Sequence, residues 1–116
     1  MKALSTSDLK KAFEKDPEFL GVFALNRIPI QPVPVNKNVK FIINLDPDDL
    51  PGSHWVAVRR TEGRGFYFDS FGRVPPLEIQ NWLVQNCHVW TYNPIVVQKK
   101  SNKVICGYLC IEFLKS

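Results

Sequence analysis

The segment His54–Arg59 is apolar at almost every position, with the sequence HWVAVR. A strand with one wet face alternates apolar and polar side chains, whereas a strand covered on both faces does not. This run therefore predicts a central strand with packed layers on both sides. Thr61–Gly65 has the composition of a hairpin loop, and Gly65–Asp69 is predicted to be the strand that returns beside it.

The remaining pattern predicts an α+β domain. Helices are predicted over residues 5–15, over residues 77–85 and from Cys106 to the C-terminus, with further strands over residues 39–44 and 94–98. Three prolines make residues 28–38 an irregular connection. Because 116 residues leave room for one core, we expect a single domain over residues 1–116, with a central, mostly antiparallel sheet flanked by helices.

Three cysteines are too few, and an odd number, for a disulfide scaffold. The first residues lack the apolar core of a signal peptide, and no apolar run approaches the length of a membrane span. We therefore expect an intracellular protein that is neither secreted nor inserted in a membrane. We also expect it to be a monomer.

The formal net charge is +4, and part of it is clustered. The two basic groups are Arg59, Arg60 and Arg64, and Lys99, Lys100 and Lys103. A solvated charged face is the simpler interpretation of these groups, and a site for DNA or another polyanion is the alternative.

Cys106-Gly107 stands at the predicted start of the last helix, directly after a polar loop. Catalysis by a thiol needs a thiolate, a base and donors for the oxyanion. The free N–H groups and dipole of a helix N-terminus favour an anion, and Gly107 leaves room beside the sulfur for a substrate carbonyl. Cys106 is therefore a candidate nucleophile, although a buried structural cysteine is the commoner use of this residue type.

Three further residues can complete such a site. His54, one of two histidines, begins the central strand and can pair with a thiol near neutral pH. Asp69 ends the neighbouring strand, where its carboxylate can orient the imidazole, form the turn that follows, or do both. Gln98 lies eight residues before Cys106 and can donate a hydrogen bond to the oxyanion.

Taken in this order, the motifs resemble those of the adenain family, the maturation proteases of adenoviruses, with relatives in large DNA viruses, virophages and Maverick-type transposons. The matching segments are Gly52-Ser53-His54-Trp55, Phe68-Asp69-Ser70-Phe71-Gly72, Gln98 and Cys106-Gly107-Tyr108-Leu109-Cys110. The resemblance covers nearly the whole chain, and a more distant one extends to the proteases that process SUMO. Asp69 stands where adenoviral members have Glu.

The resemblance implies a papain-like, adenain-like fold in which the nucleophile begins the last helix. It implies a cysteine endopeptidase that cleaves virion precursor proteins, after motifs such as Gly-Gly, in the host cell and in the virion. His54, Asp69 and Cys106 would then be catalytic, with Gln98 in the oxyanion hole. We expect the neighbours of these residues in the motifs to contact substrate, namely Gly52, Ser53, Trp55 and Gly107.

No metal or other cofactor is expected for this chemistry, but adenoviral members are activated by a peptide and by DNA, so either activator is left open. Cys87 stands at a spacing similar to that of the adenoviral cysteine that pairs with the peptide, although an ordinary half-buried cysteine is the simpler interpretation. Cys110, one helical turn after Cys106, is predicted to be core. Trp55 can pack over the imidazole of His54 or belong to the core.

Two other functions stay open. The first is a peptidase that acts on ubiquitin-like C-terminal tails, which also end in Gly-Gly. Ile105 precedes the nucleophile where SUMO proteases typically carry Asp, which favours the viral branch. The second is a catalytically silent binding module on the same fold, and the complete set of four candidate residues argues against it.

Overall fold

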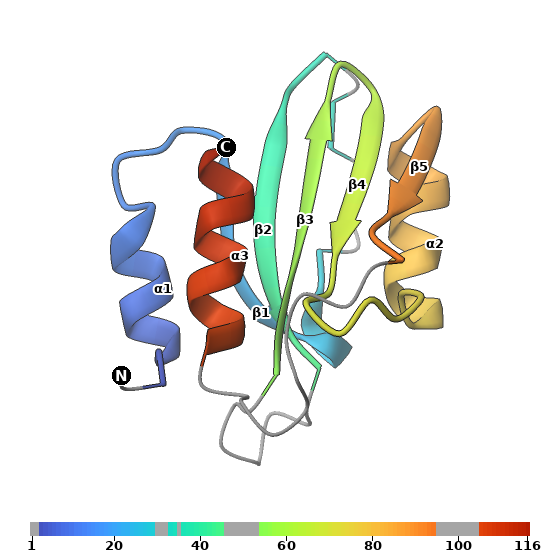
Figure 1. Cartoon of the computed structure of the whole chain (residues 1–116). Coiled ribbons are helices and arrows are strands. Elements are labelled where there is room, and N and C mark those ends of the chain that lie inside the picture. The colour runs from blue at the N-terminus through green and yellow to red at the C-terminus, as the bar shows by residue number, and fades with distance from the viewer. Residues whose placement is uncertain (1–2, 30–32, 35, 46–53, 95–104) are drawn as a thin grey trace.

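The computed structural model describes residues 3–29, 33–34, 36–45, 54–94 and 105–116. Within these ranges, five strands form one sheet in the order β1-β2-β3-β4-β5, with helices on both of its faces (Figure 1). The elements are α1 (Thr6–Ala12), β1 (Phe19–Ala24), the 3-10 turn η1 (Leu25–Arg27), β2 (Val39–Asn44), β3 (Trp55–Thr61), β4 (Arg64–Phe68), α2 (Leu77–Asn86), β5 (Val89–Tyr92) and α3 (Cys106–Lys115).

The sheet is mixed, so the expectation of a mostly antiparallel sheet is wrong. The central pairs β2–β3 and β3–β4 are antiparallel, whereas the outer pairs β1–β2 and β4–β5 are parallel. The chain passes through α2 between β4 and β5, and a crossover of this kind returns a strand in the same direction as its neighbour. The α+β class itself is confirmed.

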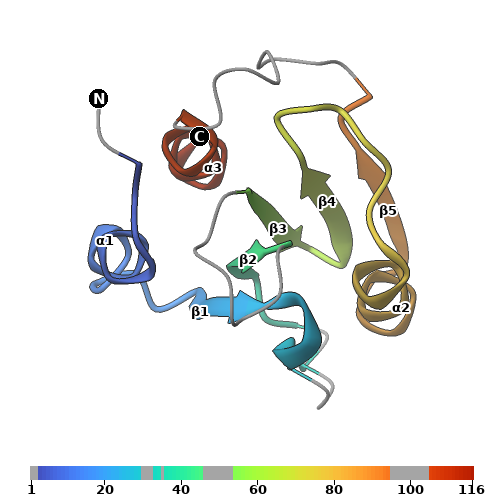
Figure 2. The same cartoon turned by 90° about the horizontal axis from the view of Figure 1, so that it is seen from below.

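The central strand β3 is covered on both faces, as its apolar run predicts. Val56 and Val58 join the core cluster under α2, while Trp55 and Ala57 join the cluster under α1 and α3. Figures 1 and 2 show α1 and α3 on one side of the sheet and α2 on the other. Each cluster is built from alternate positions of the strands, because successive side chains point to opposite faces.

The β3–β4 hairpin turns at Glu62 and Gly63, which have φ angles of 52° and 79°. Thr61 pairs with Arg64, so the loop has two residues. Two successive left-handed residues match the right-handed twist of a tight hairpin. The turn therefore fixes the register that runs on to the far end of both strands, where His54 and Asp69 lie.

The predicted helices are present, with different lengths. α2 and α3 begin where the sequence predicts, and Ser5 caps α1 through a reciprocal pair of hydrogen bonds with Asp8. However, α1 ends at Ala12 rather than near residue 15. The strands β1 and β5 were not predicted, and the strand expected over residues 94–98 lies, except for Pro94, outside the described residues.

Candidate active site

His54 and Asp69 meet at the end of the β3–β4 hairpin opposite its turn. The pairing of the two strands ends at Ala57 and Phe68, so His54 precedes the paired part of β3 and Asp69 follows β4. His54 Nε2 lies 2.7 Å from Asp69 Oδ1, and the two residues expose only 5% and 1% of their surface. The expectation that the hairpin brings this pair together is confirmed.

Asp69 also shapes the turn that follows it. Its Oδ1 accepts a hydrogen bond from the backbone N–H of Phe71, and its carbonyl accepts one from Gly72 N–H. Gly72 has a φ of 69°, a conformation that favours glycine. The turn places the Phe71 ring against the imidazole of His54, with centroids 4.5 Å apart and the planes nearly parallel. Asp69 therefore has both of the roles that the sequence allowed.

Cys106 is the first residue of α3, and it packs against β3 at the backbone of Trp55. Trp55 N–H donates to Cys106 Sγ at 3.4 Å, and Cys110 Sγ donates to Trp55 O at 3.3 Å. Both backbone groups are free for this because the pairing with β4 stops at Ala57. The spacing of one helical turn lets the two sulfurs contact the N–H and the C=O of the same residue, which sets the position of α3 along β3.

The imidazole of His54 is placed to carry a positive charge. Burial alone would lower its pKa, but hydrogen bonding with Asp69 and Cys106 and the negative charge of these groups raise it from 6.5 to about 9. Nδ1 is buried and has no hydrogen bond of regular geometry in the described part of the chain. With Nε2 committed to Asp69, Nδ1 is the ring atom left for proton exchange.

Asp69 is held as an anion. Burial alone would raise its pKa, but hydrogen bonds from His54 and from Phe71 N–H, together with the charges of His54 and Arg73, lower it below 3.8. Arg73 Nε lies 3.6 Å from Asp69 Oδ2, and the guanidinium also covers the Phe71 ring at 4.8 Å. A buried carboxylate with these partners favours the imidazolium form of His54.

Asn93, which directly follows β5, is a contributor that the sequence analysis missed. Its Oδ1 accepts a hydrogen bond from Asp69 N–H at 2.9 Å, and its Nδ2 donates to Asp69 O at 2.7 Å. A lone Asn before a proline is typical of a turn, so the sequence carried no signal for this contact.

The two described residues expected to contact substrate are instead buried. Trp55 belongs to the core beneath α3, and its Nε1 donates to Leu4 O at 3.3 Å. A Cβ on Gly107 would meet Trp55 Cδ1 at 3.2 Å and Leu4 at 3.3 Å, so this glycine allows close packing rather than substrate approach. Contact with substrate at these two residues stays a prediction. Phe71, not Trp55, packs over the imidazole of His54, so Trp55 follows the second of its two interpretations and belongs to the core. Gly52, Ser53 and Gln98 lie outside the described residues.

The remaining cysteines follow their simpler interpretations. Cys110 is fully buried, and burial raises its pKa well above 9. Cys87 ends α2 as a half-buried thiol, and its pKa is raised chiefly by burial. All three cysteines are free thiols.

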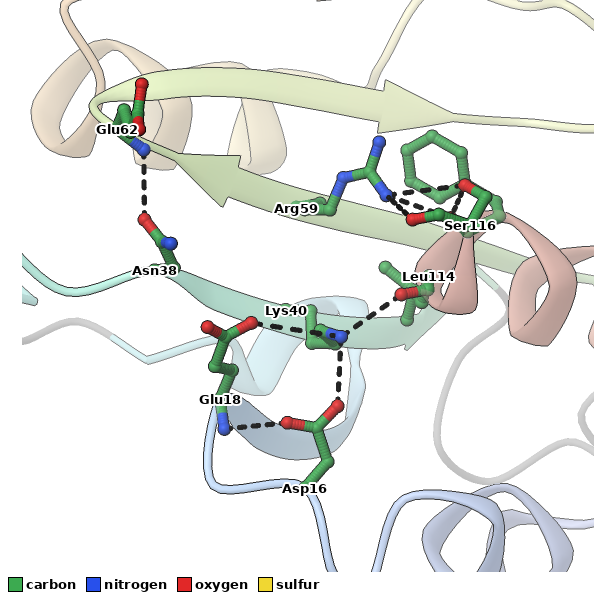
Figure 3. A network of polar contacts seen from close by, with 9 residues as sticks. Asp16, Glu18, Asn38, Lys40, Arg59, Glu62, Leu114 and Ser116 are labelled. Carbon is green, nitrogen blue, oxygen red and sulfur yellow. Dashed lines mark hydrogen bonds and ion pairs between the residues drawn. The ribbon is translucent and has the colours of Figure 1, made fainter.

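The first basic group is not a solvated face, so that interpretation is wrong for two of its three members. Arg60 exposes none of its surface and donates to the backbone carbonyls of Val33, Pro34, Lys37 and Asn86. Arg59 Nη1 donates to Phe113 O and Ser116 O at the end of α3 (Figure 3). Arg64 is exposed, and the lysine group lies outside the described residues.

A cavity of about 340 Å³ is lined by residues that are neighbours in sequence of Asp69 and Cys106. It is lined by Phe68, which precedes Asp69, and by Leu109, Glu112, Phe113 and Ser116.

In the described ranges, no helix is long and apolar enough to cross a membrane, and no group of three or more His, Cys, Asp or Glu side chains is arranged to hold a metal.

The sequence matches no protein-family model and no curated protein. The geometry of the site and the resemblance of its motifs are therefore the two indications of function.

Proposed function

We propose that this protein is a cysteine endopeptidase of the adenain type, in which Cys106 is the nucleophile, His54 the acid and base, and Asp69 the group that orients His54. The observation that carries the proposal is the buried contact of 2.7 Å between His54 Nε2 and Asp69 Oδ1, on a ring whose pKa is also raised by Cys106. A thiol at a helix N-terminus, beside an imidazole held by a carboxylate, is the arrangement that nucleophilic thiol catalysis requires.

The proposed reaction has two halves. The Cys106 thiolate attacks the carbonyl carbon of the scissile peptide bond, the C–N bond breaks, and the leaving amine takes a proton from the His54 imidazolium. Neutral His54 then removes a proton from a water molecule, which attacks the thioester and releases the carboxylic acid and the thiolate. The Cys106 backbone N–H and Gln98, the latter on sequence alone, are the proposed donors to the oxyanion.

Restricted access supports a substrate with small residues at the cleavage site. Cys106 exposes only 1% of its surface, and the aromatic ring of Phe71 lies against His54. Because a glycine brings no side chain to be accommodated, cleavage after a Gly-Gly motif fits such a site. With the motif resemblance, this favours virion precursor proteins as substrates, cleaved in the host cell and in the virion, with a peptide or DNA as activator.

The same burial also favours a second candidate function. A thiol with 1% exposure is what a catalytically silent binding module on this fold would show. The two candidates differ in one chemical property, the reactivity of the sulfur toward reagents in solution.

The test is cleavage of fluorogenic peptides that end in Gly-Gly, with and without DNA, by the native protein and by the Cys106→Ala and Cys87→Ser variants. We expect turnover by the native protein and by Cys87→Ser, and none by Cys106→Ala. Cleavage of a ubiquitin-like probe but not of virion-type peptides would move the substrate to ubiquitin-like tails.

Alkylation with iodoacetamide, mapped by mass spectrometry, separates an inactive enzyme from a silent module. A peptidase should be labelled first at Cys106, and at a rate that falls in the His54→Ala variant. Labelling of Cys87 alone, together with no cleavage of any peptide, would contradict the proposal and favour the binding module.

A further inference from the structure

We propose that Asn93 is a positioning residue, whose side-chain amide fixes the backbone of Asp69 and thereby aims the Asp69 carboxylate at His54. For its kinetic consequence the inference rests on the proposed peptidase function. Its structural consequence, the protonation behaviour of His54, does not depend on any activity.

The contact stands where the β4–β5 ladder stops. The parallel pairing ends at Tyr67 and Tyr92, and the next backbone contact, from Asn93 N–H to Tyr67 O, is long at 3.4 Å. The paired part of the ladder therefore stops before Asp69.

The side chain of Asn93 bonds Asp69 where the next backbone pair of the ladder would lie. It accepts from Asp69 N–H at 2.9 Å and donates to Asp69 O at 2.7 Å. A carboxamide carries one acceptor and one donor group at the spacing of a peptide, so it can satisfy both backbone groups of one residue. The ladder is thus extended from Tyr67 to Asp69 through a side chain.

Backbone fixation matters here because the carboxylate itself is held on one side only. Asp69 Oδ1 takes His54 Nε2 and Phe71 N–H, while Oδ2 is buried without a hydrogen bond in the described part of the chain. Arg73, the ionic partner of Oδ2, is 3.6 Å away and 56% exposed on its side chain. The direction of the carboxylate therefore depends on the backbone of Asp69, which the Asn93 side chain holds from the β5 side and Gly72 N–H holds within the turn.

The test is the pKa of His54, followed by NMR from its ring protons, in the native protein and in Asn93→Ala. We expect a pKa near 9 in the native protein and a fall of about one unit or more in the variant, because the opposite charge is no longer held in place. In the proposed reaction, kcat should fall about 10–100-fold with KM unchanged, as for other groups that orient a catalytic side chain.

The matched control is Asn38→Ala. Asn38 also accepts a backbone N–H at 2.9 Å, from Glu62, but does so at the hairpin turn, far along the strands from His54. This variant should leave both the pKa of His54 and kcat unchanged. Equal shifts in the two variants would reduce Asn93 to a general structural residue and overturn the proposal.

A second measurement needs no substitution and covers the case in which Asn93→Ala fails to fold. Amide hydrogen exchange of the native protein should show Asp69 N–H protected like the paired residues of β4, although it lies beyond the last of them. Exchange of this amide at the rate of an open loop would overturn the inference. If no peptide is ever cleaved while the His54 and exchange results hold, the proposed peptidase function fails and the role of Asn93 stands.

Discussion

The two ends of α3 pack against the same sheet but differ in how their polar groups are satisfied. At the C-terminal end, Lys40 Nζ donates to Leu114 O at 3.1 Å and Arg59 donates to Phe113 O at 3.1 Å (Figure 3). Both cations come from strands, and both complement the negative end of the helix dipole. At this end the carbonyls of Phe113 and Leu114 have charged donors, and these contacts anchor the helix to the sheet.

The N-terminal end leaves buried polar atoms unsatisfied. His54 Nδ1 and Asp69 Oδ2 have no hydrogen bond of regular geometry within the described ranges, and Trp55 N–H is a weak donor to the sulfur of Cys106. Unsatisfied buried polar atoms cost free energy, and proteins tend to keep them where they have a use. The contrast agrees with the proposed function, in which one end of α3 anchors the helix and the other end holds the proposed catalytic groups.

The largest expected effect is at the N-terminal end. His54→Ala removes the group that exchanges the proton, so kcat/KM should fall by about 10²–10⁴, the usual contribution of general acid–base catalysis. The free energy of unfolding, measured by urea denaturation, should change far less than that factor implies. If His54→Ala lost stability but cleaved peptides at the native rate, the proposed catalytic role of His54 would be wrong.

The next effect is the pH dependence of stability, tested with Asp69→Asn. The folded pKa of His54, about 9, lies above the unfolded value of 6.5, so its contribution to stability is complete below pH 6.5 and is lost as pH rises through 9. The folded pKa of Asp69 is lowered, so its contribution is present above the unfolded value and is lost as pH falls. Asp69→Asn removes the charge that both shifts depend on.

The measurement is urea denaturation at several pH values between 6 and 10. The native protein should lose stability relative to Asp69→Asn over the range from 6.5 to 9, and the difference should narrow at higher pH. Two curves that stay parallel across this range would show that the His54–Asp69 pair is not charged in the folded protein.

The sequence predicts the candidate site better than it predicts the sheet, and the reason is physical. His54 and Asp69 lie next to two strands joined by a tight hairpin, so a local turn decides whether they meet. Cys106 starts a helix whose apolar stripe is plain in the sequence. The parallel outer pairs depend instead on crossover connections, which sequence periodicity does not describe. β5 is four residues long and follows α2 closely, so it offers too short a pattern to be recognised.

The buried arginine shows where a usable signal was overlooked. Arg60 belongs to the same alternate positions of β3 as Val56 and Val58, which face α2, so the period of a strand places it inside. Its charge suggested the surface. The carbonyls that receive it come from the irregular segment after η1 and from the end of α2, and only the folded structure brings these together.

A smaller effect is expected at the anchored end. Lys40→Met removes a charged donor to Leu114 O and an ion pair of 2.9 Å with Asp16, and should lower the free energy of unfolding by about 1–2 kcal/mol. The kcat of peptide cleavage should stay unchanged. Lys10→Met, at an exposed position of α1, is the control and should change neither quantity. A loss of kcat in Lys40→Met alone would show that the two ends are coupled.

The smallest effect is expected at Arg73, an exposed residue whose guanidinium lies near the Asp69 carboxylate. Its side chain is 56% exposed, and its Nε lies 3.6 Å from Asp69 Oδ2, so solvent and salt screen the interaction. Arg73→Ala should raise the pKa of Asp69 slightly and reduce kcat by less than about threefold, and it should not lower the pKa of His54, because the lost charge has the same sign as the imidazolium. Arg73→Lys should recover part of the loss, because it keeps the charge but not the flat stacking on Phe71.

Salt decides between the two contributions of Arg73. If it acts through charge on Asp69, the difference between the native protein and Arg73→Ala should shrink as the salt concentration rises from about 0.01 to 1 M, over which the Debye length falls from about 30 to 3 Å. If it acts by holding Phe71 against His54, the difference should persist at high salt, since stacking is screened little. A difference that persists at high salt would mean that packing of Phe71 on His54, as well as charge, supports the N-terminal end of α3. The two ends of the helix would then differ less sharply, because both would depend on packing.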